Sequence, residues 1–305
     1  MMDGFRHEAV LYRGIEGLLD AVLPFVTEGL QRGEPVMVAE PPDALVALEA
    51  ALGADARRVT FVDICSLGRN PARIIPEWLR FVEKFGGRGP VRGVGEPAWV
   101  GRSAVELEEC RLHEALLNVA FDDGPGWQLI CPYDESGLPA EAIEGALHTH
   151  PYVGGADQPH GEYTGHEGAL TRFRGPLSPA PPDAVAMAFD AAGLSGLRAR
   201  IRSLARQIAL TPDRTDDLVL AAHELAGNSV QHAGGHGTMR SWRTDTSLVT
   251  EIADAGSIKD PLVGREPVLD LAEGGRGVAI ANELCDLVQV RSSADGTTVR
   301  LHTWL

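Results

Sequence analysis

The first half of the chain alternates short apolar runs with longer amphipathic ones, and this alternation restricts the possible folds more than any other feature. The apolar runs, which are strand candidates, span residues 9–12, 36–40, 59–64, 91–94 and 127–133. Helical periodicity marks residues 17–31, 42–52, 71–85, 103–121 and 139–148. Strict alternation predicts an α/β domain in which a mostly parallel, doubly wound sheet is covered by helices on both faces.

Ligands of such sheets bind beyond the carboxyl ends of the strands, near a switch in strand order. Four polar residues at or near the predicted strand ends are candidates for sensing a ligand: Tyr12, Asp63, Glu96 and Cys131. Each also has a structural interpretation, because Asp63 can cap the following helix and Cys131 can be a small buried residue. No Gly-x-x-x-x-Gly-Lys-Ser/Thr motif follows the first strand, so we expect a RecA-like or Rossmann-like domain without a phosphate-binding loop.

Cysteine and histidine residues of this half offer a second interpretation. His7, Cys65, His113 and Cys131 could converge on a metal ion. Isolated Cys and His residues without close ligand spacing are more often core residues or satisfied hydrogen-bonding groups. The sequence therefore favours a structural role for these four residues over a metal site.

Several short motifs of this half resemble the MEDS domain, a DcmR-type sensory module named for methanogen and methylotroph regulators. In chain order they are His7 and Tyr12, Phe25 with Glu28-Gly29, Gly33-Glu34, Gly68-Arg69-Asn70-Pro71, Gly95-Glu96-Pro97, residues 113–118, Cys131-Pro132-Tyr133-Asp134, and His150-Pro151. The resemblance covers residues 7–151. It implies that the first domain binds a small organic ligand.

A Gly- and Pro-rich stretch separates the two halves. Residues 152–182 have a composition that predicts a linker with little helix or strand. A chain of 305 residues is long enough for two hydrophobic cores. We therefore expect a sensory domain over residues 1–151, the linker over 152–182, and a second domain over 183–305.

The second half contains a helix that presents a carboxylate and a carboxamide on one face. Thr211 and Pro212 predict a helix start, and glycines end the segment near residue 235. Glu224 and Asn228 are four residues apart, so their side chains lie one turn apart on the same face. An Asn oxygen can ligate Mg²⁺, and a neighbouring Glu can orient or deprotonate a nucleophile.

Three later motifs make this helix more informative. A strand-like run, residues 249–253, ends in Asp254-Ala255-Gly256, where a carboxylate could accept a hydrogen bond from a base. Glycine-rich residues 273–277 precede a helical run, and free amides at a helix start bind phosphate oxygens. Gly296-Thr297-Thr298 precedes the last strand. Each motif alone is a common turn, but their order and spacing form a recognisable set.

Together these motifs resemble the GHKL superfamily of ATP-binding domains. Glu224 and Asn228 match its N-box, Asp254 and Gly256 its adenine-binding Asp-x-Gly, Gly275 and Gly277 its second glycine box, and Gly296 with Thr297 or Thr298 its closing Gly-Thr. The resemblance implies a Bergerat-fold α/β sandwich with a mixed sheet, and ATP and Mg²⁺ as cofactors. It assigns the hydroxyl-activating role to Glu224, Mg²⁺ to Asn228, and nucleotide contacts to Asn228, Asp254, Gly256, Gly274, Gly275, Arg276, Gly277, Thr297 and Thr298.

The chain departs from that family at Ile258, where the first glycine box often has a second glycine. A stiffer loop over the nucleotide is expected, which puts tight ATP binding in doubt.

An amphipathic helix over residues 193–210 leads directly into the N-box helix, with no room for the phosphoacceptor hairpin of a histidine kinase. This compact arrangement resembles the RsbW-like anti-sigma-factor serine kinases. It implies phosphoryl transfer from ATP to a Ser or Thr of an anti-anti-sigma (STAS-type) protein, binding of a sigma factor, and a homodimer. Two alternatives stay open: a partner-binding switch that transfers nothing, with or without ATP, and a histidine-kinase-like protein.

Composition indicates a cytoplasmic regulator. No apolar stretch approaches the length of a membrane span, and the amino terminus does not read as a signal peptide. Four scattered cysteines suggest reduced thiols. A formal net charge of -16 argues against direct nucleic-acid binding, because attraction to phosphate is missing, and it suits a basic protein partner.

Overall fold

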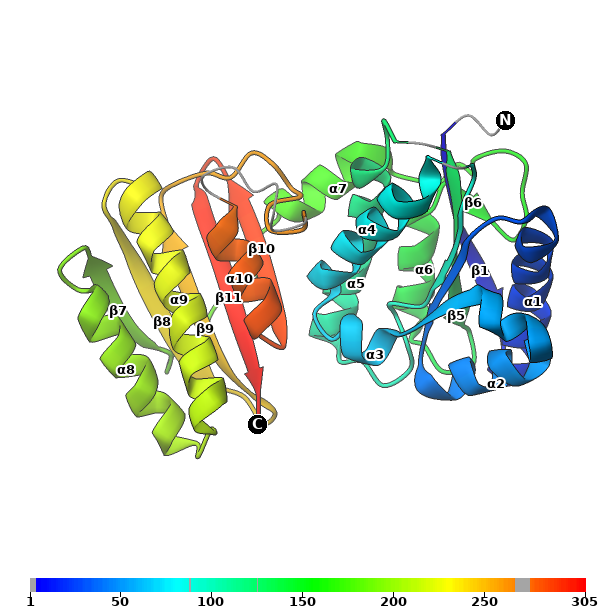
Figure 1. Ribbon diagram of the computed structural model, residues 1–305. Coiled ribbons are helices and arrows are strands. Elements are labelled where there is room, and N and C mark those ends of the chain that lie inside the picture. Colours follow the sequence, from blue (N-terminus) through cyan, green and yellow to red (C-terminus); the bar gives the residue numbers. More distant parts are fainter. Residues whose placement is uncertain (1–3, 88, 125, 267–274) are drawn as a thin grey trace. The chain divides into compact units, whose positions relative to one another are not determined.

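The computed structural model describes residues 4–87, 89–124, 126–266 and 275–305. The chain divides into two compact units, Met1–Ala169 and Leu170–Leu305, which we call the N-terminal and C-terminal units. Among the described residues, no helix is long and apolar enough to cross a lipid bilayer. Each unit is built around its own sheet (Figure 1).

The N-terminal unit contains the parallel sheet that the alternating pattern predicts. Its strands, in the order β3-β2-β4-β5-β1-β6, are β3 (Val59–Asp63), β2 (Val36–Glu40), β4 (Arg92–Gly95), β5 (Trp127–Asp134), β1 (Phe5–Tyr12) and β6 (Tyr152–Val153). Every strand pair in this sheet is parallel. The predicted α/β fold class is confirmed.

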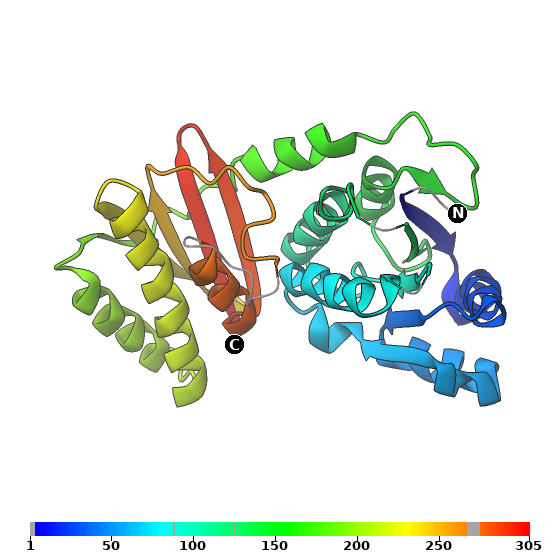
Figure 2. The same cartoon turned by 45° about the horizontal axis from the view of Figure 1, so that its top comes forward.

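Helices cover both faces of this sheet. They are α1 (Gly14–Arg32), α2 (Pro42–Leu52), α3 (Ile64–Leu67), α4 (Ile74–Gly86), α5 (Ala104–Ala120) and α6 (Ala140–Thr149), with short 3-10 turns at Gly53–Arg58 and Pro71–Arg73. Figure 1 and Figure 2 show α1 and α2 on one face and α4, α5 and α6 on the other. The apolar stripe of α1, which includes Leu18, Val22 and Val26, packs on Val38, Val94 and Ile130 of the sheet.

Glycines in β4 allow α4 to lie directly on the sheet. A Cβ atom at Gly93 would come within 2.8 Å of the Trp78 ring and 2.9 Å of Leu129, and one at Gly95 would come within 3.1 Å of Trp78. Trp78 is only 2% exposed. The strand therefore lacks side chains where the large indole needs the space.

The C-terminal unit is a two-layer sandwich. Its strands, in the order β10-β11-β9-β8-β7, are β10 (Leu287–Ser293), β11 (Gly296–Trp304), β9 (Ser247–Asp254), β8 (His236–Arg243) and β7 (Val185–Asp190). The helices α8 (Leu194–Gln207), α9 (Pro212–His232) and α10 (Arg276–Leu284) form a layer over one face of this sheet (Figure 1). The expected α/β sandwich is present.

The sequence resemblance implied a mixed sheet in this unit. In the structure every strand pair of this sheet is antiparallel, which corrects that expectation. Two antiparallel helices, α8 and α9, connect β7 to β8. They return the chain to the end where β7 stops, as the pairing of Asp190 with His236 shows. Short turns join β8 to β9 and β10 to β11, which also makes these pairs antiparallel.

The Gly- and Pro-rich stretch, predicted to lack regular structure, contains β6 and a helix, α7 (Gly165–Arg174). Ala169 and Phe173 lie one turn apart in α7 and are 0% and 2% exposed. The packing of these two apolar residues outweighs the helix-breaking composition around them. Tyr152 of β6 pairs with Glu8 of β1.

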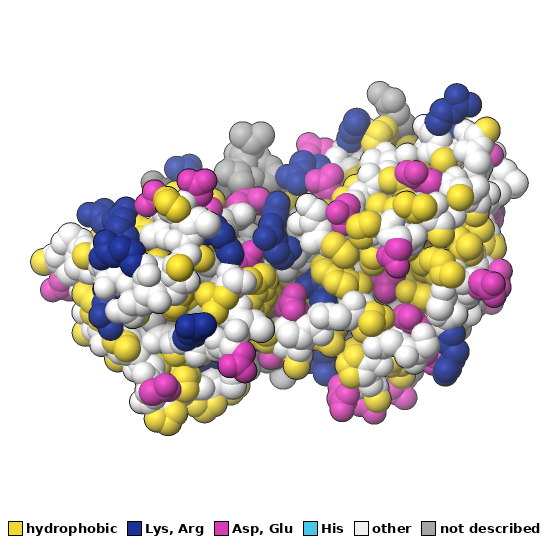
Figure 3. Space-filling model, turned by 90° about the horizontal axis from the view of Figure 1, so that it is seen from below, with side chains coloured by type: hydrophobic (Ala, Val, Ile, Leu, Met, Phe, Trp, Pro, Cys, Tyr) yellow, Lys and Arg dark blue, Asp and Glu magenta, His cyan; other side chains and the backbone are white. Residues whose placement is uncertain are grey.

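Basic side chains occur in both units of this acidic chain. On the face shown in Figure 3, Lys and Arg side chains gather over the C-terminal unit, at the left of the view. Helix α8 contributes Arg198, Arg200, Arg202 and Arg206 to this unit.

We expect Gly93→Ala to destabilise the N-terminal unit by about 1–3 kcal/mol, because the added methyl group must displace the Trp78 ring or the backbone. Urea unfolding followed by tryptophan fluorescence measures the change. Gly87→Ala is the matched control, since no atom outside its immediate chain neighbours lies within 4 Å of a Cβ built there. A loss no larger than that of the control would contradict this account of β4.

Candidate functional site

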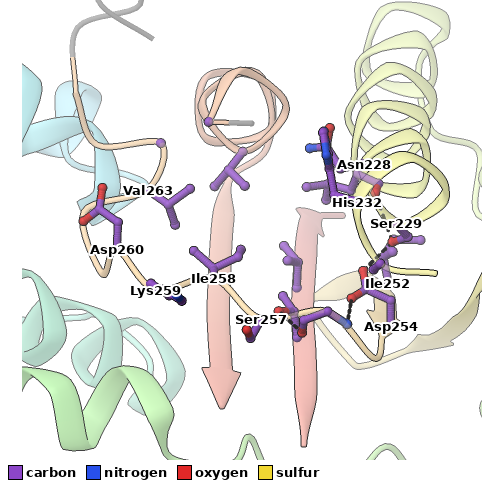
Figure 4. A pocket seen from close by; sticks show the side chains of 18 of the residues that line it. Asn228, Ser229, His232, Ile252, Asp254, Ser257, Ile258, Lys259, Asp260 and Val263 are labelled. Atoms are coloured by element: carbon purple, nitrogen blue, oxygen red, sulfur yellow. Dashed lines mark hydrogen bonds between the residues drawn. The ribbon is translucent and has the colours of Figure 1, made fainter. Parts of the chain in front are cut away.

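A cavity of about 500 Å³ opens between α9, α10 and the end of β9 in the C-terminal unit (Figure 4). Among the described residues, its apolar walls are formed by Leu225, Ile252, Ile258, Val263, Val278 and Val299. Its polar side chains include Asn228, Ser229, His232, Asp254, Ser257, Lys259, Asp260 and Thr297. Apolar walls with a few convergent polar groups are typical of a small-molecule site.

Asp254 is held in a fixed orientation at the end of β9. Its Oδ1 accepts a hydrogen bond from the backbone N–H of Gly256 at 2.8 Å, and its Oδ2 accepts one from the Ser229 hydroxyl at 2.5 Å. Ser229 lies on α9 and is 1% exposed. This contact joins α9 to β9 and fixes one wall of the cavity. The sequence interpretation missed Ser229, although it directly follows Asn228.

Asn228 lies where α10 approaches α9 closely, at Gly277. A Cβ atom at Gly277 would lie 2.5 Å from Asn228 Nδ2 and 3.4 Å from the backbone oxygen of Glu224. A side chain at residue 277 would displace the Asn228 carboxamide, so glycine lets the first turn of α10 lie beside Asn228 in this orientation. Gly275, at the start of α10, also lines the cavity. The helix start therefore directs backbone amides toward the same space as the carboxamide.

The loop after Asp254 is fastened to the β10–β11 hairpin by a chain of hydrogen bonds. The Ile258 amide donates to Ser292 Oγ at 2.7 Å, Ser292 Oγ lies 2.8 Å from Thr297 Oγ1, and Thr297 Oγ1 donates to the backbone oxygen of Gly256 at 2.9 Å. Ile258 does not have a left-handed backbone conformation; among the described non-glycine residues, only Ala209 does. The conformation of this loop therefore does not require glycine at residue 258.

Not all of the other predicted site residues of the C-terminal unit line the cavity. Glu224 is half-buried on α9 and lies outside the cavity lining, and Arg276 is exposed. Thr297 lines the cavity, whereas Thr298 faces a second cavity on the opposite side of the sheet, because successive strand residues point to opposite faces. Gly274 lies outside the described residues.

Two of the predicted ligand-sensing residues meet at the carboxyl edge of the N-terminal sheet. The Tyr12 hydroxyl donates to the Glu96 carboxylate, at 3.0 and 3.1 Å from its two oxygens. Glu40, at the end of β2, interacts electrostatically with Glu96, and its two buried carboxyl oxygens accept no hydrogen bond from the described residues. Both glutamates are almost fully buried.

Burial governs the protonation of this edge cluster, which consists of Tyr12, Glu40 and Glu96. Desolvation raises the pKa of Glu96 to about 7, against the opposing hydrogen bonds from Glu40 and Tyr12. Burial and the nearby Glu96 carboxylate raise the pKa of Glu40 well above its ordinary value. A carboxyl pair that keeps a proton near neutral pH can both donate and accept hydrogen bonds.

Asp63 and Cys131 do not join this edge cluster. Asp63 caps α3 by accepting from the amides of Cys65 and Ser66 at 2.9 and 3.2 Å, as its structural interpretation expected. Cys131 lies in the interior of β5, where it pairs with Ala9, and is 1% exposed. Its position is therefore inside the unit and not at the strand end.

Comparisons with known families agree with this architecture. Residues 6–151 match the family described as MEDS, the MEthanogen/methylotroph, DcmR Sensory domain. Residues 187–303 match the family described as Histidine kinase-like ATPase domain. These two matches confirm the predicted resemblances to the MEDS domain and to the GHKL ATP-binding domains. The chain therefore has a region similar to the MEDS sensory domain, followed by a region similar to kinase-like ATPase domains.

Among solved structures, the chain is similar to the RsbU and RsbW domains of Rv1364c from Mycobacterium tuberculosis, with 20% sequence identity and a TM-score of 0.31. The similarity covers 41% of this chain and 33% of that chain, so the match spans about a third of the solved structure. A comparison with curated proteins found no match.

We expect the contribution of Glu96 to the stability of the N-terminal unit, measured as the difference in unfolding free energy between wild type and Glu96→Gln, to fall as pH rises from about 4.5 to about 7. In this window the folded state keeps the Glu96 proton, whose folded-state pKa is about 7, while the unfolded state has lost it. Glu96→Gln should lack this part of the pH dependence and raise stability at pH 8 by about 1–3 kcal/mol relative to wild type. Urea unfolding at several pH values measures both effects.

The exposed variant Glu49→Gln, on α2, is the control for removing one carboxylate and should keep the wild-type pH dependence. An unchanged slope in Glu96→Gln would show that Glu96 does not hold its proton in the folded state.

Proposed function

We propose that the C-terminal unit binds ATP with Mg²⁺ in the cavity between α9 and α10, and transfers the γ-phosphoryl group to a Ser or Thr of a partner protein. The observation that carries this proposal is that Asn228 and Asp254, from separate elements, line one cavity with apolar walls. The cavity volume lies within the range of small-molecule sites, about 300–1,000 Å³. The match of residues 187–303 to the histidine kinase-like ATPase family supports nucleotide as the ligand.

Asp254 is suited to select adenine. Because Ser229 and the Gly256 amide hold both carboxylate oxygens, the side chain keeps one orientation and still has free lone pairs. The exocyclic amine of adenine can donate to such a lone pair, while Ile252 and Val299 cover the flat base. This arrangement distinguishes an amino-substituted base from one with a carbonyl at that position.

Asn228 and the start of α10 are suited to the phosphates. The Asn228 amide nitrogen lies toward Gly277, which leaves the oxygen available as a hard ligand for Mg²⁺. Backbone amides at the start of α10 and the exposed Arg276 supply further positive charge. Phosphoryl transfer depends mainly on positioning and on this kind of charge neutralisation.

Glu224 is the candidate group for orienting or deprotonating the attacking hydroxyl. It lies one turn before Asn228 on the same helix, outside the lining of the cavity. A base for an incoming protein hydroxyl belongs at the mouth of a nucleotide site, where the partner arrives. The same position also supports the second candidate, a switch that binds ATP and a partner but transfers nothing.

The proposed partners are an anti-anti-sigma protein of the STAS type as phosphoryl acceptor, and a sigma factor held in alternation with it. A second copy of the chain is a further proposed partner, forming a homodimer. The N-terminal unit is proposed to bind a small organic ligand at Tyr12, Glu40 and Glu96, where polar groups meet at a strand edge. Regulation then requires this ligand to change ATP or partner affinity by a measurable coupling energy.

Asp254→Ala is expected to weaken ATP binding about 10-fold to 100-fold, because a hydrogen bond to a charged group contributes about 1.5–3 kcal/mol. Asn228→Ala is expected to remove the Mg²⁺ dependence of binding, since a methyl group cannot ligate a metal. Titration calorimetry of the whole chain with ATP, with and without Mg²⁺, measures both. Asp245→Ala, which removes an exposed carboxylate in the β8–β9 turn, is the control. ATP affinity equal to the control in Asp254→Ala would remove Asp254 from the site.

Glu224→Gln is expected to bind Mg-ATP with wild-type affinity but to transfer phosphate at least about 100-fold more slowly, because it cannot accept the hydroxyl proton. Incubation with Mg-ATP and candidate STAS-type proteins, with detection of transferred phosphate, measures this. A wild-type chain that binds both ATP and partner without transferring phosphate supports the switch. Phosphate found on a histidine of the chain itself supports the histidine-kinase alternative.

A further inference from the structure

Four side chains that commonly bind metals meet in the interior of the N-terminal unit, away from the edge cluster. His7 lies on β1, Cys131 on β5, Glu114 on α5, and His150 directly after α6. One ligand atom of each lies within 4.8 Å of those of the other three. Each residue is at most 1% exposed. The cluster therefore connects two strands and two helices at a point that water reaches poorly.

The distances between these atoms suit a tetrahedral metal centre. His7 Nε2 lies 3.0 Å and His150 Nε2 lies 3.3 Å from Glu114 Oε2. Cys131 Sγ lies 3.4 Å from His7 Nε2 and 3.6 Å from Glu114 Oε2. Bonds of about 2.0–2.3 Å to a tetrahedral ion give ligand-to-ligand distances of roughly 3.3–3.8 Å. Small side-chain shifts suffice to surround an ion.

The hydrogen bonds around His7 fix its tautomer. Asn118 Nδ2 lies 2.8 Å from the Thr149 oxygen and 3.2 Å from the Glu114 backbone oxygen, so this atom is the amide nitrogen. Asn118 Oδ1 is then an acceptor, 3.1 Å from His7 Nδ1, which must carry the hydrogen. When the ring is neutral, His7 Nε2 then presents a bare lone pair to the cluster.

His150 is oriented in the same way. Its Nδ1 lies 2.9 Å from the backbone oxygen of Ala146, which can only accept, so Nδ1 donates and Nε2 presents its lone pair to Glu114. Histidines that bind metals usually donate their other ring N–H to a carbonyl or carboxylate group in this manner. Both imidazoles are therefore arranged as metal ligands usually are.

With both imidazoles neutral, the atoms that face one another in the cluster have few hydrogens between them, although the Tyr133 hydroxyl can also donate to Glu114. Two imidazole nitrogens face the same carboxylate oxygen of Glu114, and the Cys131 thiol can donate its single hydrogen to only one acceptor. Electron pairs that face one another in a buried site repel unless a cation lies between them. The geometry points to a metal ion there, and we propose that His7, Glu114, Cys131 and His150 bind one transition-metal ion of the Zn²⁺ class.

The donor set selects the class of ion. Two imidazole nitrogens, a sulfur and a carboxylate oxygen suit Zn²⁺ and similar divalent transition metals, whereas Mg²⁺ and Ca²⁺ prefer oxygen ligands. Four protein ligands complete a tetrahedral shell, which is typical of a structural site. The Cys131 thiol loses its proton when the ion binds. The ion would hold β1, β5, α5 and the end of α6 together.

The test is a Co²⁺ titration of the whole chain, purified without a metal-affinity column and stripped with a chelator. We expect one Co²⁺ per chain, an intense tetrahedral visible spectrum, a thiolate-to-cobalt charge-transfer band, and displacement by Zn²⁺. Cys131→Ser should lose the charge-transfer band and weaken Co²⁺ binding about 100-fold or more. Asn118→Ala should keep the band but weaken binding about 10-fold to 100-fold, because His7 loses its orienting partner.

Cys110→Ser is the matched control, since Cys110 is also buried, on α5, and its thiol donates to the backbone oxygen of Pro97 outside the cluster. It should keep both the band and the affinity. Circular dichroism checks that each variant is folded. Failure of the wild-type chain to bind Co²⁺, or binding without a sulfur band, overturns the proposal. Binding that Cys131→Ser leaves unchanged overturns it as well, and leaves a proton-sharing network of histidines and glutamate as the explanation of the cluster.

Discussion

The close approach of α10 to α9 at Gly277 is the contact on which the cavity of the C-terminal unit depends. A side chain at residue 277 would meet the Asn228 carboxamide and displace it from its position in the cavity wall. The opposite wall depends on the bond from Ser229 to Asp254. Neighbouring residues of α9 therefore make both contacts: the Asn228 carboxamide lies against Gly277 of α10, and the Ser229 hydroxyl donates to Asp254.

Local patterns predicted much of this architecture. Thr211 and Pro212 begin α9 as expected, with the Thr211 hydroxyl accepting from the Arg214 amide at 3.4 Å. The apolar run over residues 36–40 forms β2 with the predicted bounds. These elements follow from capping and periodicity, which depend on neighbours in sequence. The sequence could not decide whether Thr297 or Thr298 lines the cavity. The answer depends on which face of β11 lies under α10, and this is a property of the tertiary structure.

The sequence interpretation did not predict features that depend on tertiary packing. His7 and Cys131 were among the weighed metal ligands, but Cys65 and His113 were weighed with them in place of Glu114 and His150. No local spacing connects residues so far apart along the chain. They meet only because β1 pairs with β5 in one register, which places Ala9 opposite Cys131, and because α5 and α6 cover that face.

The two buried polar clusters of the N-terminal unit differ in their access to solvent, and this difference separates their roles. Tyr12 is half-buried at the carboxyl edge of the sheet and partly accessible, whereas Glu40 and Glu96 behind it are 0% and 2% exposed. The interior cluster is at most 1% exposed, so a ligand cannot exchange there without opening the unit. A sensor must exchange its ligand as concentrations change. The partly accessible Tyr12 therefore suits the proposed sensing role, and the closed interior cluster suits the proposed permanent ion.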